Sequence, residues 1–358
     1  MNTKTIVRLF LILAGLAAAT ALTMYLGSSR QEEIRMGQPL FQDLDVNSIA
    51  TIKVETPDQT FTIIKTQGAW TVAERGGYKA DFDKVARFGR KLAALTVGRA
   101  FEYDAATLAR LSLKLPGTMG SPKSEKGTLF TLLDENDGEI AKILVGKDRT
   151  QQTPEGYPMP AGQFIRMGAM ENVYLVDRFF EPVGQAPADW LKKAILQVPS
   201  SEVASVSCME IRDGKQRVIY ELSRATPGEA FALSDQKPVK KSEVDKLADA
   251  LSALTMEDVH PVSEEEKPEG PFLDYWLFDG TRYRVTKAPA GEEGCEVRVE
   301  VSYMAPVSAE GKDADEKMVQ EVEALNAQLK PWAFKLSGWR CSTLVTDVES
   351  LLDQETVQ

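Results

Sequence analysis

Two stretches of this chain carry nearly the same amphipathic pattern, and this near-repeat constrains the fold more than any other feature. The first, DFDKVARFGRKLAALTV at 81–97, spaces its apolar side chains as on one helical face: Val85, Phe88, Leu92 and Leu95. The second, KKSEVDKLADALSALTMEDV at 240–259, repeats those intervals 159 positions later with Val244, Leu247, Leu251 and Leu254. Asp81 and Ser242 are the predicted N-caps. We therefore expect one supersecondary unit to occur twice.

Strand patterns flank both predicted helices. The apolar positions of VNSIATIKVET align with those of VASVSCMEIRD at an offset of 157: Val46, Ile49, Ile52 and Val54 with Val203, Val206, Met209 and Ile211. Hairpins are predicted at Asp137-Gly138 and Asp279-Gly280 because Asp-Gly favours tight turns between strands. The predicted fold class is α+β: an N-terminal transmembrane helix followed by two duplicated modules of antiparallel sheet, each with a packed helix.

The N-terminus determines the expected location. LFLILAGLAAATALTMYLG, residues 9–27, contains no charged side chain, and a helix of this length covers the roughly 30 Å hydrocarbon core. Lys4 and Arg8 precede it, so the positive-inside rule places the N-terminus in the cytoplasm and the remainder in the periplasm of a bacterium, on the inner membrane. A cleaved signal peptide is the alternative, since AAATA offers A-x-A sites, but the apolar run continues beyond them.

The same segment holds a predicted helix-packing face. Gly15 and Ala19 lie four residues apart, the spacing that lets transmembrane helices approach closely, although such pairs also arise by chance in alanine-rich helices. The predicted division of the chain is cytoplasmic N-terminus 1–8, transmembrane helix 9–27, tether 28–45, first module 46–182, linker 183–200, second module 201–305 and C-terminal helix-strand-helix segment 306–358.

Charge and residue types exclude several functions. The formal net charge of -11 repels phosphate backbones, so we expect no nucleic acid partner. The single histidine, His260, rules out a zinc site built on several histidines, and the three cysteines lack C-x-x-C spacing. One disulfide among Cys208, Cys295 and Cys341 is allowed but not required. No nucleotide-binding or nucleophile motif occurs, so we predict no enzyme activity, no catalytic residues, no metal and no cofactor.

Several motifs, in this order, resemble a known bacterial family. They are I-x-x-I-x-V, W-x-V near Trp70, ADFDKVARFGRKLAAL, ILVGKD, VYLVD, DWLKKAILQV and the closing WAFKLSGWRCSTLVTDVESLL. Together they resemble the family of domain of unknown function 4340, DUF4340. The resemblance implies an anchored periplasmic protein encoded beside an ABC-type transporter of the gliding-motility kind. It implies as partners the membrane, the integral permease and its auxiliary subunits, and it supplies no catalytic residue.

Two functions remain open at this stage. The first is a non-catalytic accessory or scaffold protein of an ABC-type envelope transport complex. The second is a ligand- or polymer-binding subunit that delivers substrate to the transporter, for which an exposed aromatic groove would be needed. Its possible aromatic contacts are Tyr157, Trp276, Tyr283 and Trp332. Core packing is the competing role for these side chains, because aromatic residues dominate burial.

Overall fold

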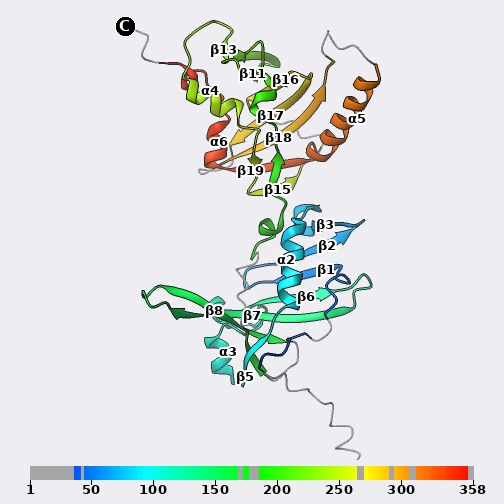
Figure 1. The fold of residues 1–358 in the computed structure, drawn as a ribbon, viewed down its shortest axis with the longest axis vertical. Coiled ribbons are helices and arrows are strands. Elements are labelled where there is room, and N and C mark those ends of the chain that lie inside the picture. Colours follow the sequence, from blue (N-terminus) through cyan, green and yellow to red (C-terminus); the bar gives the residue numbers. More distant parts are fainter. Residues whose placement is uncertain are drawn as a thin grey trace, which may run out of the picture.

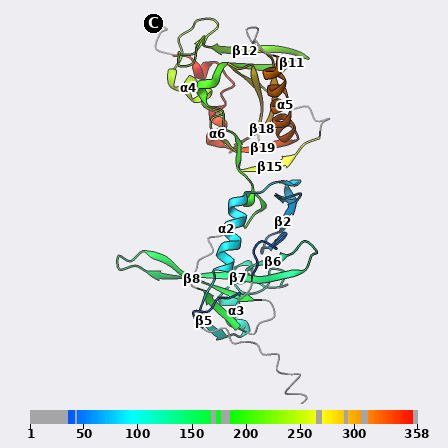
Figure 2. The same ribbon diagram turned by 45° about the vertical axis from the view of Figure 1, so that its right-hand side comes forward.

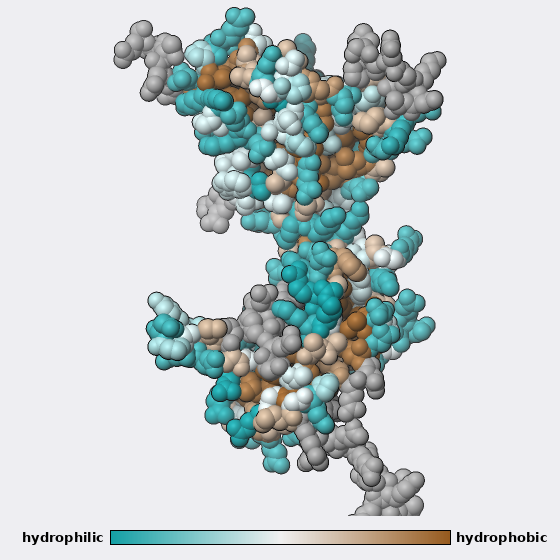
Figure 3. Space-filling view, viewed as in Figure 1, coloured by the Kyte–Doolittle hydropathy of each residue, from teal (hydrophilic) through white to brown (hydrophobic). Residues whose placement is uncertain are grey.

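The computed structural model describes residues 36–41, 44–167, 172–176, 185–263, 270–289, 294–305 and 312–353. Two β-sheet units lie end to end, with the first half of the chain in one and the second half in the other (Figure 1). The view turned by 45° shows the same narrow waist between them (Figure 2), and so does the space-filling view (Figure 3). The molecule is therefore elongated.

The first unit is built on a nine-stranded antiparallel sheet, as far as the described residues show, in the order β4-β3-β2-β1-β6-β7-β8-β9-β5. Its strands are β1 Thr51–Glu55, β2 Thr60–Thr66, β3 Ala69–Val72, β4 Tyr78–Lys79, β5 Val97–Glu102, β6 Thr128–Leu133, β7 Glu139–Gln152, β8 Pro158–Met167 and β9 Asn172–Val176. Its helices are α2 Phe82–Ala93 and α3 Ala105–Arg110, with 3-10 turns η1 Ala73–Arg75 and η2 Lys123–Glu125. The predicted hairpin at Asp137 joins β6 to β7.

The second unit contains an eight-stranded antiparallel sheet within the described ranges, in the order β13-β12-β11-β16-β17-β18-β19-β15. Its strands are β11 Val203–Arg212, β12 Lys215–Ser223, β13 Ala232–Leu233, β15 Asp258–Pro261, β16 Phe272–Leu277, β17 Thr281–Pro289, β18 Gly294–Tyr303 and β19 Trp332–Ser337. Its helices are α4 Lys241–Ala248, α5 Lys312–Leu329 and α6 Gly338–Thr343, with 3-10 turns η4 Ser200–Glu202 and η5 Glu349–Leu351. The predicted hairpin at Asp279 joins β16 to β17.

Helix α2 follows its predicted pattern. The Asp81 carboxylate accepts a hydrogen bond from the Lys84 amide at 3.1 Å, which confirms the predicted N-cap. The predicted apolar stripe is buried at Val85, Phe88, Leu92 and Leu95, although the helix ends at Ala93, before Leu95. Phe88 lies against Phe130 of β6, with ring centroids 5.0 Å apart. The helix therefore covers one face of the first sheet, which we call its inner face.

Helix α4 departs from its prediction. It begins at Lys241, and the N-cap residue Lys240 has no side-chain cap bond, so the predicted cap at Ser242 is wrong. The Lys240 amide instead donates to the Leu351 carbonyl at 2.8 Å, a contact with the distant η5 turn. The helix ends at Ala248, and Leu251 lies in the turn that follows. The stripe is buried nonetheless, because the chain keeps the same side facing the sheet.

The two large sheets follow one strand order. β3-β2-β1-β6-β7-β8-β9-β5 in the first corresponds, strand for strand, to β13-β12-β11-β16-β17-β18-β19-β15 in the second. Pairing with the neighbouring strands matches Val54 to Cys208, an offset of 154. The predicted offset of 157 is therefore wrong, since it matches the buried Val54 to Ile211, which is 61% exposed. An odd shift in register turns a strand's side chains to the opposite face.

The predicted fold class is also wrong. The described chain is predominantly antiparallel β-sheet, in three sheets, rather than the predicted α+β arrangement. The third sheet is small and joins β10 Ala194–Leu196 to β14 Leu254–Thr255. Among the described residues, no helix is both long and apolar enough to cross a membrane. Residues 9–27, with Gly15 and Ala19, lie outside the described residues.

The outer faces of the two sheets differ. In the first unit, residues 103–127, here called the cover segment, cross the outer face and build a second apolar cluster around Leu113, Leu129, Leu144 and Val173. In the second unit, β15 and β16 correspond to β5 and β6. Only residues 262–271 join them, fewer than half the number of residues in the cover segment. At the same register as Leu144, the second sheet carries the polar Thr286. The first outer face is therefore covered by its own chain, whereas the second has a short connection and a polar residue where the first has Leu144.

A small set of contacts fixes the junction between the units. Arg75 of η1 donates from Nε to Asp258 Oδ1 at 2.6 Å and from Nη2 to Oδ2 at 2.9 Å. Tyr78 packs edge-on against Trp332, with ring centroids 5.0 Å apart. Lys79 Nζ donates to Gln328 Oε1 at 2.9 Å. These contacts join β4 and η1 of the first unit to β15, α5 and β19 of the second.

The linker is held on the first unit. Trp190, in the 3-10 turn η3 Pro187–Trp190, is fully buried and packs edge-on against Phe88 at 5.6 Å. Its carbonyl accepts a hydrogen bond from the Asp81 amide at 2.7 Å. The linker then pairs with β14 of the second unit through β10. Trp190 therefore ties the connection between the units to helix α2.

The junction ion pair predicts an acid-dependent contribution to stability. Burial raises the pKa of the Asp258 carboxyl, but the hydrogen bonds from Arg75 and the Val259 amide, with nearby positive charge, outweigh it and lower the pKa overall. A carboxyl with a lowered folded-state pKa stabilises the fold above its unfolded pKa of about 3.9 and loses that effect as the pH falls through its folded value. We expect Asp258→Asn to reduce the unfolding free energy by about 1 kcal/mol at pH 7, since the pair is partly exposed.

Thermal unfolding of wild type and variant over a pH series measures the contribution of Asp258 to the unfolding free energy. The difference between them should shrink below about pH 4 as Asp258 becomes protonated in both folded and unfolded wild type. Glu135→Gln, on an exposed turn without a side-chain partner in the described chain, should show no such trend. A difference that grows on acidification would contradict the assignment.

One disulfide joins Cys295 of β18 to Cys341 of α6. The bond shows which two of the three cysteines pair, and it joins helix α6 to the second sheet. Cys208 is buried and free, and burial raises the pKa of its thiol to about 12. A thiol with so high a pKa is a poor nucleophile at neutral pH.

Candidate functional site

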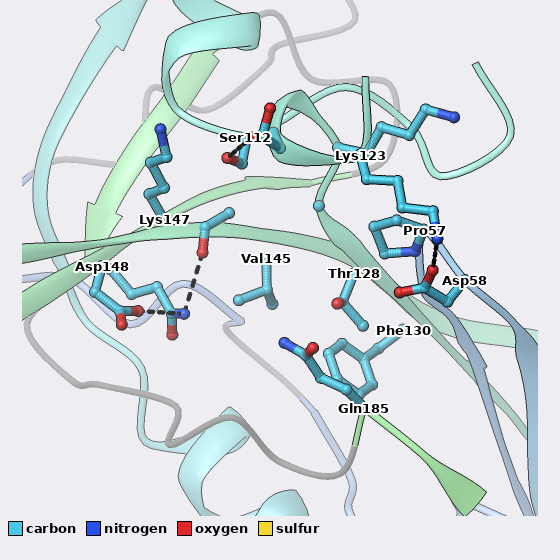
Figure 4. A pocket seen from close by; sticks show the side chains of 15 residues that line it. Pro57, Asp58, Ser112, Lys123, Thr128, Phe130, Val145, Lys147, Asp148 and Gln185 are labelled. Atoms are coloured by element: carbon cyan, nitrogen blue, oxygen red, sulfur yellow. Dashed lines mark hydrogen bonds and ion pairs between the residues drawn. The ribbon is translucent and has the colours of Figure 1, made fainter. Parts of the chain in front are cut away.

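A polar pocket of about 510 Å³ opens on the first unit, where the cover segment crosses the sheet. Its walls come from the turn after β1, the cover segment, and strands β6, β7 and β8. Figure 4 shows Lys123 with Asp58 at one end and Lys147 with Asp148 at the other, and Val145 and Thr128 between them. Charged side chains therefore lie at both ends of the pocket, and the floor between them is partly polar and partly apolar.

The pocket exists because two paired strands have unequal lengths. β6 begins at Thr128, which pairs with Val145, whereas β7 continues to Gln152. Beyond Val145 the cover segment takes the place of β6, and the Lys147 amide donates to the Leu111 carbonyl at 2.9 Å. Register shifts between β7 and β8 at Asp148 bend the strand here, as bulges often do beside functional sites.

Two glycines allow the cover segment to approach the sheet. A Cβ at Gly127 would lie 2.6 Å from the Val145 carbonyl oxygen, and one at Gly146 would lie 2.4 Å from the Leu111 carbonyl oxygen. Both distances are too short for any side chain, so only glycine fits. The wall between cover segment and sheet is thus a close backbone contact, which fixes the pocket's shape.

The buried amide of Gln163 organises one end of the pocket. Its Nε2 donates to Asp148 Oδ1 at 2.9 Å and to the Gly146 carbonyl at 3.2 Å. Partial burial raises the pKa of the Asp148 carboxyl. At the other end, Lys123 Nζ forms an ion pair with Asp58. Between the two ends, Ser112 donates to the Ser124 carbonyl at 2.6 Å (Figure 4).

The four predicted aromatic contacts do not meet in one groove. Tyr157 is exposed at the tip of the β7–β8 hairpin. Trp276 and Tyr283 lie on opposite faces of the second sheet, because Tyr283 pairs with the core residue Tyr275 whereas Trp276 pairs with Arg282. Trp332 packs against Tyr78 in the junction. Of the four, Tyr283 is buried, and none lines the pocket.

The remaining sequence candidates stay apart from the pocket. His260 is on β15, half-exposed, with Nε2 3.6 Å from Glu296 Oε2. The described residues include no group of three or more histidine, cysteine or acidic side chains arranged to hold a metal ion. The predictions of no enzyme activity and no cofactor stay predictions.

Sequence reasoning missed the pocket. It assigned KLPGTMGSPKSEKG to an exposed loop, yet this segment supplies Lys123, Lys126 and Gly127 to the pocket wall. A signal was present upstream: Leu108, Leu111 and Leu113 form an apolar group in a short segment, and Leu113 is fully buried. An apolar group of this kind requires a surface to pack against, and the outer face of the sheet provides one.

The fold and pocket define a protein of two antiparallel-sheet units, with a polar pocket on the first. A family model described as "Domain of unknown function (DUF4340)" matches residues 70–271, more than half of the 358 residues. The chain therefore belongs to the DUF4340 family, and the resemblance noted in its motifs is confirmed. The match runs from β3 to the residue before β16, so it spans the junction. No curated protein and no solved structure matches the chain.

Proposed function

We propose that this chain is a non-catalytic, membrane-anchored periplasmic accessory protein of an ABC-type envelope transport complex, acting as a scaffold. The observation that carries the proposal is an exposed apolar group at the β11–β12 end of the outer face of the second sheet. There Met209 of β11 pairs with Val218 of β12, and with Ile211, two residues further along β11, they form an apolar group here called the outer patch. Ile211 is 61% and Val218 57% exposed.

The surroundings of the outer patch fit a protein-binding surface. Arg284 stacks over Phe272 at 4.2 Å, and Arg282 lies 5.4 Å from the ring of Trp276, all on the same outer face. Arginine, methionine and aromatic residues are enriched at protein interfaces. The corresponding face of the first sheet is covered by its own chain, so the second unit is the one left to receive a partner.

The described start of the chain supports attachment through the N-terminus. Leu40 is buried, and its amide donates to the Leu95 carbonyl at 2.8 Å, so the predicted tether is already fixed to the first unit there. Residues 28–35 separate the apolar N-terminal stretch from the described chain. Eight residues span at most about 30 Å, so an anchor at 9–27 would keep the first unit near the membrane and raise the effective concentration of a membrane partner.

The disulfide supports the periplasmic location. Structural disulfides persist in oxidising compartments, including the bacterial periplasm, and are rare in the cytosol. The Cys295–Cys341 bond agrees with the orientation that Lys4 and Arg8 indicate. The transporter partner itself rests on what the family resemblance implies.

Charged substitutions in the outer patch test the scaffold role. We expect the double variant Ile211→Asp, Val218→Asp to lower recovery of the permease at least tenfold when the full-length chain is purified from native membranes. Two carboxylates would be desolvated without partners in an apolar interface. Recovery is measured by quantitative mass spectrometry.

The matched control is Ile64→Asp, an exposed isoleucine on β2 of the first unit, which should leave recovery unchanged. Both altered sites are exposed, so the thermal midpoint of each variant should stay near that of wild type. Undiminished recovery with the double variant would refute the outer patch as the interface.

Ligand binding is the second candidate function, and the pocket on the first unit favours it. A subunit that delivers a ligand or polymer to the transporter requires a concave site, and about 510 Å³ falls in the range of small-molecule pockets. A single pocket of this size fits a small molecule, or one residue of a polymer, rather than a long chain.

A further inference from the structure

We propose that the pocket of the first unit binds a small polar molecule carrying one anionic group, a carboxylate or a phosphate. The proposal is independent of the scaffold role, because it concerns the first unit and leaves the outer patch of the second untouched. Either proposal can therefore fail its experiment while the other passes.

The charges in the pocket favour an anion. Its lining carries three lysines against two carboxylates, Asp58 and Asp148, in a chain with 42 basic and 53 acidic side chains. The local balance is thus opposite to that of the whole protein. Because Lys123 is paired with Asp58, Lys126 and Lys147 stand against the single remaining carboxylate, Asp148, which leaves an excess of one positive charge.

Lys126 and Lys147 both line the pocket. Lys147 Nζ donates one hydrogen bond, to the neutral Arg110 carbonyl at 3.1 Å, which leaves two of its three donors. Lys126 is half-buried beside Gly127, where the close backbone contact fixes the chain. An ammonium group acts on carboxylate or phosphate as a point charge. The site therefore selects for negative charge rather than for one arrangement of the ligand's oxygen atoms.

The remaining walls indicate a polar body for the ligand. Gln185 and the hydroxyl of Thr128 line the middle of the pocket (Figure 4), and hydroxyl and amide groups both donate and accept hydrogen bonds. Phe130 and Val145 supply a limited apolar floor. A polyhydroxylated acid matches this combination better than a fatty acid, which would leave the polar walls without partners.

Calorimetric titration of the full-length chain in non-ionic detergent tests the proposal. The probes are sodium glucuronate, a carboxylate on a polyol, and glycerol 3-phosphate, a phosphate on a polyol, with glucose as the uncharged control. At constant ionic strength, we expect saturable one-site binding of at least one acid and at least tenfold weaker binding of glucose. The tighter of the two acids identifies the anionic group.

Paired variants locate the site. Lys126→Gln together with Lys147→Gln should weaken binding of that acid at least tenfold. Lys65→Gln together with Lys215→Gln removes the same charge from exposed strand positions outside the pocket and should leave binding unchanged. Wild-type affinity should also fall as sodium chloride rises, since salt screens charge, and this measurement needs no variant that must fold.

Four outcomes would overturn the proposal. The first three are no saturable binding of either acid, glucose binding as tightly as the acids, and wild-type affinity in the pocket variant. The fourth is affinity that does not change with salt, which would exclude a site based on charge.

Discussion

Replacing Leu92 or Leu251 by alanine should lower the free energy of opening of its own unit by about 2–5 kcal/mol, the range for truncating a buried leucine. Both side chains have 0% exposure and belong to the main core. Each packs beneath its own sheet, where neighbouring side chains cannot fully collapse into the space left. The two substitutions should therefore act on different units of the chain.

Hydrogen exchange measured by mass spectrometry distinguishes the units, because opening free energies are read segment by segment. Leu92→Ala should accelerate exchange in β1 and β6, and Leu251→Ala in β11 and β16. Phe82→Ala is the matched control, an apolar truncation at a 65% exposed position of α2, and should change opening by less than about 0.5 kcal/mol. Equal effects of both leucine variants on both units would show that the units open together.

Removing the carboxylate of Asp274 should cost about 3 kcal/mol, since it leaves an arginine in a largely buried site without its partner. The Asp274 side chain is 2% exposed and accepts two hydrogen bonds from Arg284, each 2.7 Å long. We expect a loss of unfolding free energy at the lower end of the range for broken buried ion pairs. The Arg284 side chain is 22% exposed, so it can turn toward water. Urea denaturation of Asp274→Ala measures it.

The first sheet supplies the matched control for this pair. Thr131 and Lys142 occupy the corresponding cross-strand positions there. The double variant Asp274→Thr, Arg284→Lys should therefore destabilise the second unit less than Asp274→Ala alone, because it replaces a buried ion pair with a combination that the same strand order already accommodates. A larger cost for the double variant would contradict this explanation.

Local patterns predicted helix α2 and the two Asp-Gly hairpins. The stripe around Leu92 and the turn at Asp137 depend on neighbours within a few residues, so spacing and residue type suffice. The exact register of β11 did not follow, because an alternating apolar pattern fits more than one register and only the pairing with β12 and β16 fixes it. The cap at Ser242 failed for a similar reason, since a contact with the distant Leu351 fixes where α4 begins.

Long-range features lay beyond sequence reasoning. The Arg75–Asp258 pair joins residues 183 positions apart, and no pattern marks either member. The pocket depends on the cover segment returning to the sheet at Gly146, and that crossing is a tertiary event. The fold class was misjudged because the helix patterns stood out clearly, whereas short strands in a large sheet each give a weak signal.

Purification of the unmodified full-length chain from native membranes tests the scaffold role most directly. Gentle detergent extraction and quantitative mass spectrometry should recover an ABC-type permease and its auxiliary subunit in fixed proportion to the chain. Recovery of the chain alone, or with soluble proteins in varying amounts, would contradict the scaffold role.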